Sequence, residues 1–121
     1  MPDQNVALEH APTFDAAASR KMKSALKFRA LAKEWREQHG AMSSITEMSM
    51  LPAYQKIIGL GADAVPLILE ELKIEGDEPD QWFWALRALA EDNPVAPEDQ
   101  GDFLKMAQAW IRWGEGQGYA G

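Results

Sequence analysis

Residues 51–91, LPAYQKIIGLGADAVPLILEELKIEGDEPDQWFWALRALAE, constrain the fold most, because turn residues divide them into three segments with helical spacing. In the first segment Tyr54, Ile57 and Ile58 recur at i, i+3 and i+4, which places them on one face of a helix. Gly59 and Gly61 end this segment, since glycine adopts the left-handed backbone of a helix end at little cost. We expect the rest of the protein to cover or extend this three-helix unit.

The second segment follows Asp63, a suitable N-cap, and carries Pro66 in its first turn, where proline loses no hydrogen bond. Apolar residues lie on two of its sides, which predicts a helix held between neighbours. The third segment is predicted from Gln81 to Glu91, with Asp80 as its N-cap. We predict that six residues are buried together in one core: Ile58, Val65, Leu69, Trp82, Leu86 and Trp110.

The segment LG-x-x-AVPLILEEL followed by WALRALAE resembles one unit of the HEAT-type helical repeats. In such units the first helix carries a proline near its start and the second carries an Arg-x-Ala pattern; here Pro66 and Arg87 stand at those places. Because a solenoid needs about three units, the resemblance implies a single HEAT-like α-hairpin within a small domain. The phrases PAYQKIIGLG, WFWALRAL and MAQAWIRWGEGQGY also resemble a group of small uncharacterised bacterial proteins, which implies a bacterial or phage origin.

Three further helices are predicted outside the central stretch. Residues 19–39 form the longest, with an apolar stripe on one side and basic residues around it. Ser44 and Glu47 match a capping box, which opens a short helix. The last helix is predicted to start at Pro97, whose fixed backbone suits a first turn, and to end at Gly114.

The predicted fold class is all-α: a compact bundle of about five antiparallel helices with a HEAT-like α-hairpin core. A length of 121 residues, of which 46% are apolar, suits one domain. We divide the sequence into a mobile N-terminal tail (1–17), a single helical domain (18–114) and a glycine-rich tail (115–121). Because the sequence has no run long enough to span a membrane and no signal pattern at its N-terminus, we expect a cytoplasmic protein.

The residue types predict neither catalysis nor a bound cofactor or metal ion. The sequence has no cysteine, and His10 and His39 lack the spacing of metal ligands. The acidic clusters at 77–80 and 98–102 do not match a calcium loop, and the glycines at 59–61 lack the strand and lysine of a phosphate loop. We therefore expect a non-enzymatic protein. A hydrolase that uses the acidic clusters is a third hypothesis, behind the two described below.

Charge is unevenly distributed along the sequence, whose net charge is −7. Residues 1–36 carry seven of the twelve basic residues, whereas residues 37–121 carry fifteen of the nineteen acidic ones. A solvated amphipathic helix explains the basic pattern without a function, and a basic surface for phosphate or for an acidic protein is the functional alternative. The candidate partner-binding residues on this helix are Arg20, Lys21, Lys23, Lys27 and Arg29.

Trp84 and Arg87 are the other candidate binding residues, on the side of their helix opposite Trp82. We expect Trp84 to pack against the last helix near Trp113, because a helix inside a bundle is covered on two faces. The alternative is an exposed Trp–Arg patch, and these two residue types are enriched at binding hot spots.

Small size, acidity and missing catalytic residues favour a protein-binding module that acts on a partner protein, as antitoxins and immunity proteins do. The alternative is nucleic-acid binding or transcriptional control through the basic helix 19–39. The two hypotheses differ in salt dependence, since each phosphate contact releases counterions and makes DNA binding weaken steeply with salt. The sequence does not indicate whether the protein forms homo-oligomers.

Overall fold

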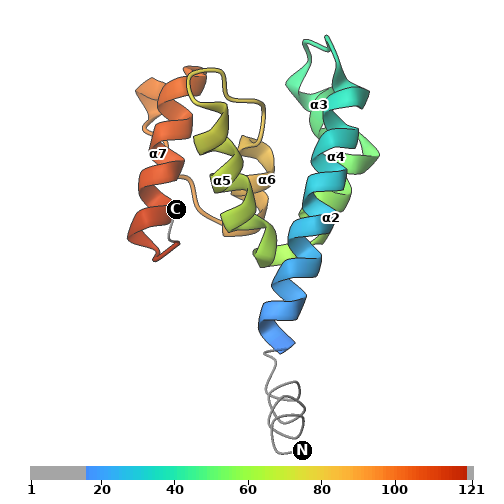
Figure 1. Ribbon diagram of the computed structural model, residues 1–121. Helices are drawn as coiled ribbons and strands as arrows, with labels where there is room; N and C mark the ends of the chain where they lie inside the picture. The colour runs from blue at the N-terminus through green and yellow to red at the C-terminus, as the bar shows by residue number, and fades with distance from the viewer. Residues whose placement is uncertain (1–15, 120–121) are drawn as a thin grey trace, which may run out of the picture.

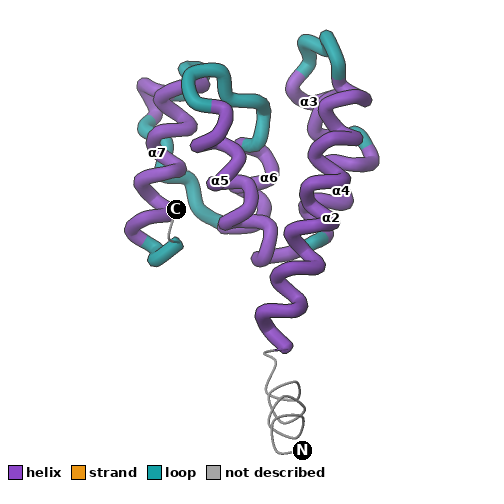
Figure 2. The backbone as a smooth tube through the Cα atoms, in the orientation of Figure 1, coloured by secondary structure: helices purple, strands orange, loops and turns teal. Residues whose placement is uncertain are grey.

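The computed structural model describes residues 16–119, which contain six α-helices, two 3-10 helices and no strand (Figure 1, Figure 2). The predicted all-α class is therefore confirmed for this part of the protein. Residues 1–15 of the predicted N-terminal tail, with His10, lie outside the described residues, as do residues 120–121. The helices are α2 (Ala16–His39), α3 (Ile45–Met50), α4 (Pro52–Gly59), η1 (Gly61–Asp63), α5 (Ala64–Glu75), α6 (Phe83–Ala90), η2 (Pro97–Asp99) and α7 (Phe103–Gly116).

The helices form two groups, which contacts of α2 with α5 and of α4 with α6 join. Figure 1 shows α2, α3 and α4 on one side of the molecule and α5, α6 and α7 on the other. α2 packs along α4 and also contacts α5, while α5 contacts both α6 and α7. The N-terminal turns of α2 project beyond the other helices (Figure 1).

Local sequence signals fix several helix ends as predicted. The Ser44 hydroxyl accepts a hydrogen bond from the Glu47 backbone N–H at 3.2 Å, so the predicted cap opens α3. Pro66 lies in the first turn of α5. Asp63 stands at the predicted N-cap of α5, but its carboxylate accepts from the Ser24 hydroxyl at 3.4 Å instead of capping the helix. This bond ties α5 to α2.

The sequence places two helix starts too early. α6 begins at Phe83 rather than Gln81, because the Asp80 carboxylate accepts from the Gln81 backbone N–H (2.8 Å) and contacts the His39 ring (2.9 Å). α7 begins at Phe103, after a 3-10 turn that includes Pro97. Its N-cap is Asp102, whose carboxylate accepts from the Lys105 backbone N–H at 3.2 Å. The start of α7 therefore depends on which residue has a side-chain oxygen free to cap it.

An aromatic cluster forms the centre of the core. Phe28, Trp35, Tyr54 and Trp82 are all buried. The Trp82 ring centroid lies 4.6 Å from that of Trp35 and 5.6 Å from that of Phe28. The Tyr54 ring lies 5.0 Å from Trp35. These large side chains join α2, α4 and the start of α6 in one apolar interior.

The predicted core is correct except at one position. Ile58 is only half-buried, because Ile57 and Tyr54 of α4 face the interior instead. The other predicted core residues are buried in one cluster: Val65, Leu69, Trp82, Leu86 and Trp110.

Gly114 allows α7 to approach α5. It is buried within α7, and a Cβ added there would lie 2.5 Å from Cδ1 of the buried Leu69. The sequence predicts that the helical domain ends at Gly114, but α7 continues to Gly116. This glycine serves close packing rather than helix termination.

We predict that Gly114→Ala lowers the free energy of unfolding by about 1–3 kcal/mol, the usual cost of overpacking a core. This loss should appear although alanine favours a helix interior by up to about 1 kcal/mol over glycine. Gly116→Ala is the matched control, because a Cβ there meets nothing within 4 Å, and it should keep or raise stability. Urea unfolding followed by circular dichroism measures both variants. Equal stabilities would show that α7 does not pack closely on α5.

Candidate functional site

The start of α6 is anchored by side chains from other elements. The Tyr54 hydroxyl donates to the Gln81 carbonyl at 3.0 Å and accepts from the Ala85 backbone N–H at 2.8 Å. Trp82 Nε1 donates to the Glu75 carboxylate at 3.0 Å. Because the first N–H groups of a helix have no acceptor within it, the tyrosine performs the task that a capping residue performs elsewhere.

Burial raises the pKa of Tyr54 above its usual value of 10.0. The nearby charge of Asp80 raises this pKa further, and the hydrogen bond from Ala85 opposes the shift. The phenol therefore stays protonated and continues to donate to Gln81. Since the unfolded protein ionises this tyrosine near pH 10 and the folded protein does not, the stabilisation is complete below that pH and is lost above it.

A network of charged groups covers the Trp82 end of the aromatic cluster. Arg36 lies over the Trp82 ring, 5.8 Å from its centroid, and forms ion pairs with Glu71 and Glu75. Burial lowers the pKa of Arg36, but the hydrogen bonds and charges of the two glutamates outweigh it, so this pKa is raised. Glu71, Glu75 and Asp80 therefore make structural contacts between α2, α5 and the turn before α6.

Trp84 lies on the opposite side of α6 and is 46% exposed. The expectation that it packs near Trp113 is wrong. Trp113 instead donates from Nε1 to Asp92 at 2.9 Å and packs its ring against Trp110. Arg87 is also exposed, and its guanidinium makes no ion pair with any residue that the structure describes. The exposed Trp–Arg patch, the alternative, is therefore the arrangement observed.

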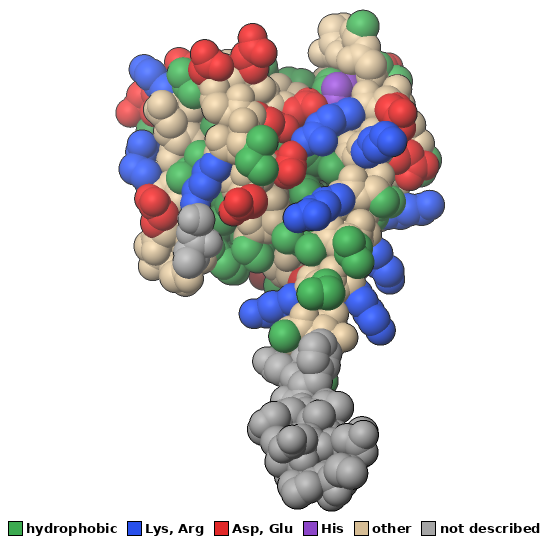
Figure 3. Space-filling model, viewed as in Figure 1, with side chains coloured by type: hydrophobic (Ala, Val, Ile, Leu, Met, Phe, Trp, Pro, Cys, Tyr) green, Lys and Arg blue, Asp and Glu red, His purple; other side chains and the backbone are tan. Residues whose placement is uncertain are grey.

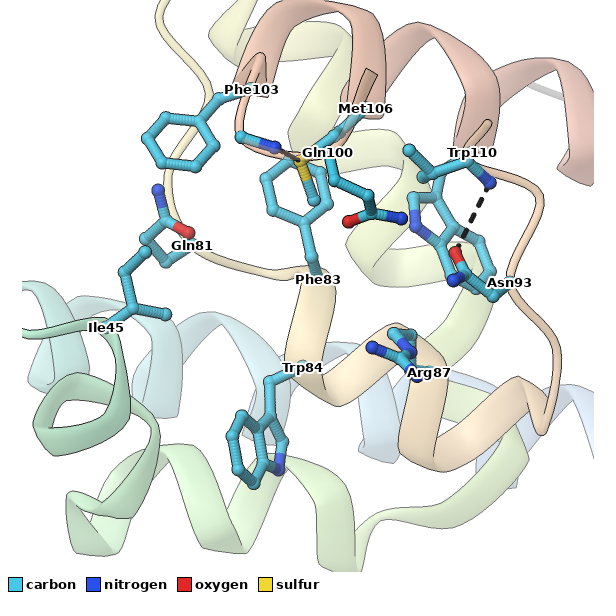
Figure 4. Close-up of a pocket in the computed structure, with 12 residues that line it drawn as sticks. Ile45, Gln81, Phe83, Trp84, Arg87, Asn93, Gln100, Phe103, Met106 and Trp110 are labelled. Carbon is cyan, nitrogen blue, oxygen red and sulfur yellow. Dashed lines mark hydrogen bonds between the residues drawn. The ribbon is translucent and has the colours of Figure 1, made fainter. Parts of the chain in front are cut away.

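Both residues line a groove of about 250 Å³ bounded by α3, α6 and α7. Figure 4 shows Phe83 and Phe103 on one side of it and Trp110 at its far end. The rings of Phe83 and Phe103 lie 6.3 Å apart. We call this feature the α6 groove; besides Trp84 and Arg87, its walls include Ile45, Phe83, Phe103, Met106 and Trp110.

Apart from Trp84 and Arg87, the wall residues of the α6 groove are not predicted as binding residues from the sequence. Phe103 stands at helical spacing from the buried Ala107 and Trp110, yet it is exposed beside the groove. Ile45 follows the α3 cap and is also exposed. The sequence offers one signal for their exposure. Ile45 and Phe103 each follow an N-cap residue at the start of a helix, where a side chain faces an end of the bundle rather than its centre.

The five predicted basic residues lie on α2, from its projecting N-terminal turns to the level of the buried Phe28, and we call residues 20–29 the basic arm. Figure 3 shows Lys and Arg side chains on both sides of the lower part of α2, whereas most acidic side chains lie higher in the view, many of them over the α5–α7 group. All five are exposed, and none forms an ion pair within residues 16–119. The α6 groove and the basic arm share no residue, so the seven predicted site residues form two separate surfaces.

The basic arm has more than one face. Arg20, Lys23 and Lys27 are spaced i, i+3, i+7 and share one side of the helix. Arg29 lies on another side, which it shares with two exposed apolar residues at i−7 and i−3, Met22 and Leu26.

Lys21 differs from the other four basic residues. With Asp63 and Tyr119 it lines a cavity of about 460 Å³ between the arm, the start of α5 and the residues that follow α7.

Within residues 16–119, no cluster of three His, Asp or Glu residues is placed to hold a metal ion. None of the helices there combines the length and hydrophobicity needed to cross a bilayer. Comparison with protein-family models, with curated proteins and with solved structures found no match. The α6 groove and the basic arm are the two candidate binding surfaces of the described residues.

We predict that Tyr54→Phe, which removes one oxygen atom, costs about 1–3 kcal/mol, because the buried N–H of Ala85 loses its acceptor. Trp84→Ala removes a whole indole ring but should cost less than about 1 kcal/mol, since that residue is nearly half exposed and lies outside the core. Urea unfolding of both variants makes the comparison. A larger loss for Trp84→Ala would show that its ring is part of the core.

Proposed function

We propose that this protein is a small non-enzymatic binding module that binds a partner protein through the α6 groove. The observation that carries this proposal is an exposed tryptophan at a mainly apolar groove, beside an arginine that makes no ion pair within residues 16–119. Tryptophan and arginine carry much of the binding free energy at protein interfaces. The anchoring of α6 supports the proposal further, because a residue on a rigid helix loses little conformational entropy on binding.

The basic arm supports a partner with an acidic surface. Its cations face solvent, and Met22 and Leu26, 64% and 60% exposed, lie beside Arg29. Exposed apolar side chains gain little from a phosphate backbone, but they gain from burial against the apolar part of a protein surface. This combination favours a protein over a nucleic acid. A module that neutralises another protein, as an antitoxin or immunity protein does, fits these surfaces.

Nucleic-acid binding is the second candidate function, and a specific observation favours it. Arg20, Lys23 and Lys27 share one side of a projecting helix, which suits contact with successive phosphates. In this hypothesis the α6 groove has no role in binding.

The architecture of the centre supports a HEAT-like α-hairpin as part of the proposal. α5 carries Pro66 in its first turn, and α6, which carries Arg87, packs against it. We propose that these two helices run antiparallel as one such unit. We also propose that the protein is bacterial and cytoplasmic, because a sequence without cysteine needs no oxidising compartment for disulfide formation.

Affinity capture from a lysate of the native host, followed by mass spectrometry, tests the protein-binding function. The full-length protein should retain one partner in stoichiometric amount. Trp84→Ala should weaken its binding by about tenfold or more, as the loss of a hot-spot residue does. Ile74→Ala is the matched control, because Ile74 is exposed outside the groove and should be dispensable. Equal retention by both variants would contradict binding through the groove.

A DNA-binding assay with the full-length protein distinguishes protein binding from nucleic-acid binding. Duplex DNA should not bind measurably at physiological salt if the protein-binding proposal holds. Tight binding that weakens steeply with salt, with a slope that flattens when the five arm residues become glutamine, would replace it with nucleic-acid binding. The five residues are Arg20, Lys21, Lys23, Lys27 and Arg29.

A further inference from the structure

The inner end of the α6 groove holds a hydrogen-bond donor without an acceptor. Trp110 is fully buried, and its Nε1–H has no partner among the residues that the structure describes. In contrast, the indole N–H groups of Trp35 and Trp82 donate to Met48 and Glu75. A buried donor without an acceptor destabilises the folded protein, so an acceptor supplied by a bound group would remove that penalty.

Arg87 adds a second unpaired donor group at the same groove. Its guanidinium lies at the α6 wall, and Figure 4 shows Trp110 and Arg87 on the same side of the groove as Asn93. The rest of the lining is mainly apolar, with Phe83, Phe103 and Met106 among it, and it also includes the amide side chains of Gln81, Asn93 and Gln100. A neutral donor, a cation and a mainly apolar lining together favour a group that has an apolar body and oxygen acceptors, at least one of them negatively charged.

The size of the groove decides what kind of group fits. Its volume of about 250 Å³ lies below the range of about 300–1,000 Å³ that accommodates whole small-molecule ligands. It suits one anchoring residue with its adjoining polar atoms. Such a single buried anchor is how many protein interfaces concentrate their binding free energy.

Access to Trp110 requires a neighbouring residue to move. Nε1 is closed to solvent, and Gln100 is an exposed residue between η2 and α7. Figure 4 shows Gln100 reaching into the groove toward Trp110. Because its amide makes no hydrogen bond within residues 16–119, this glutamine is able to swing outward without disturbing the core.

We propose that the α6 groove takes an aromatic or large aliphatic residue from an acidic segment of the partner protein. An oxygen of that segment accepts from Trp110 Nε1, and a carboxylate next to the anchor pairs with Arg87. The proposal rests on the protein-binding function and specifies the partner's chemistry: an apolar residue beside an aspartate, a glutamate or the partner's terminal carboxylate.

Titration of the full-length protein with N-acetyl-phenylalanine tests the proposal without the partner. This probe carries an apolar ring, an amide oxygen and a carboxylate. In ¹H–¹⁵N spectra, its addition should shift the indole resonance of Trp110 saturably and leave those of Trp35 and Trp82 in place. Trp110→Phe assigns the resonance. Absence of a Trp110 shift, or equal shifts of all indoles, would overturn the proposal, whereas partner capture would be unaffected.

Substitution of Arg87 tests its proposed ion pair with the carboxylate of the bound group. Arg87→Gln should weaken binding of N-acetyl-phenylalanine about two- to fivefold, the effect of one exposed ion pair. Binding of the uncharged N-acetyl-phenylalanine amide should not change. Arg112→Gln is the matched control, because Arg112 is exposed on α7 outside the groove. Equal effects of the two substitutions would overturn the role of Arg87.

Two other occupants of the groove have their own signatures in the same spectra. A Trp110 resonance that depends on protein concentration would assign the groove to a second copy of the protein. A resonance that shifts when residues 1–15 are removed would assign it to the protein's own N-terminal segment. Either result would overturn the proposal of a partner segment.

Discussion

The hydrogen bonds of Tyr54 and Trp82 are the constraint on which the rest of the structure depends. Both aromatic residues are fully buried, and each carries one polar atom that has to be satisfied there. The Tyr54 hydroxyl donates to the Gln81 carbonyl and accepts from the Ala85 backbone N–H, and Trp82 Nε1–H donates to the Glu75 carboxylate. Displacing either ring would expose a large apolar surface and leave buried polar groups unpaired. The start of α6 is therefore fixed relative to α4 and α5.

This constraint also explains why α6 presents a binding surface. A helix of eight residues is not stable by itself, so its position is set by tertiary contacts. The side that carries Trp82 and Leu86 is held in the core, and the other side must then carry Trp84 and Arg87 outward. α7 contacts α5 rather than covering this side, so a groove with apolar walls is left between the helices. The surface we propose for binding is a consequence of how the core is anchored.

The sequence predicts the parts of this arrangement that depend on local spacing. It places Trp82 and Trp84 on opposite sides of one helix, and it identifies the Ser44 cap and the proline of α5, because each signal lies within a few residues. It cannot predict whether Trp84 is covered, since that depends on the path of α7. That path changes when Asp102 instead of Pro97 starts the helix, and when Gly114 allows a close contact with Leu69. Likewise, Trp110 Nε1–H has no acceptor within residues 16–119 because of how the core is assembled, which residue spacing does not reveal.

Native-state hydrogen exchange at the Ala85 backbone amide tests the central claim most directly. An amide in the first turn of a helix has no acceptor within that helix and ordinarily exchanges fast. Because Tyr54 supplies the acceptor from α4, we predict that this amide exchanges only when the whole protein unfolds, with a protection free energy equal to that of global unfolding. Exchange as fast as that of an unprotected first-turn amide would show that α6 is not anchored and would contradict the account.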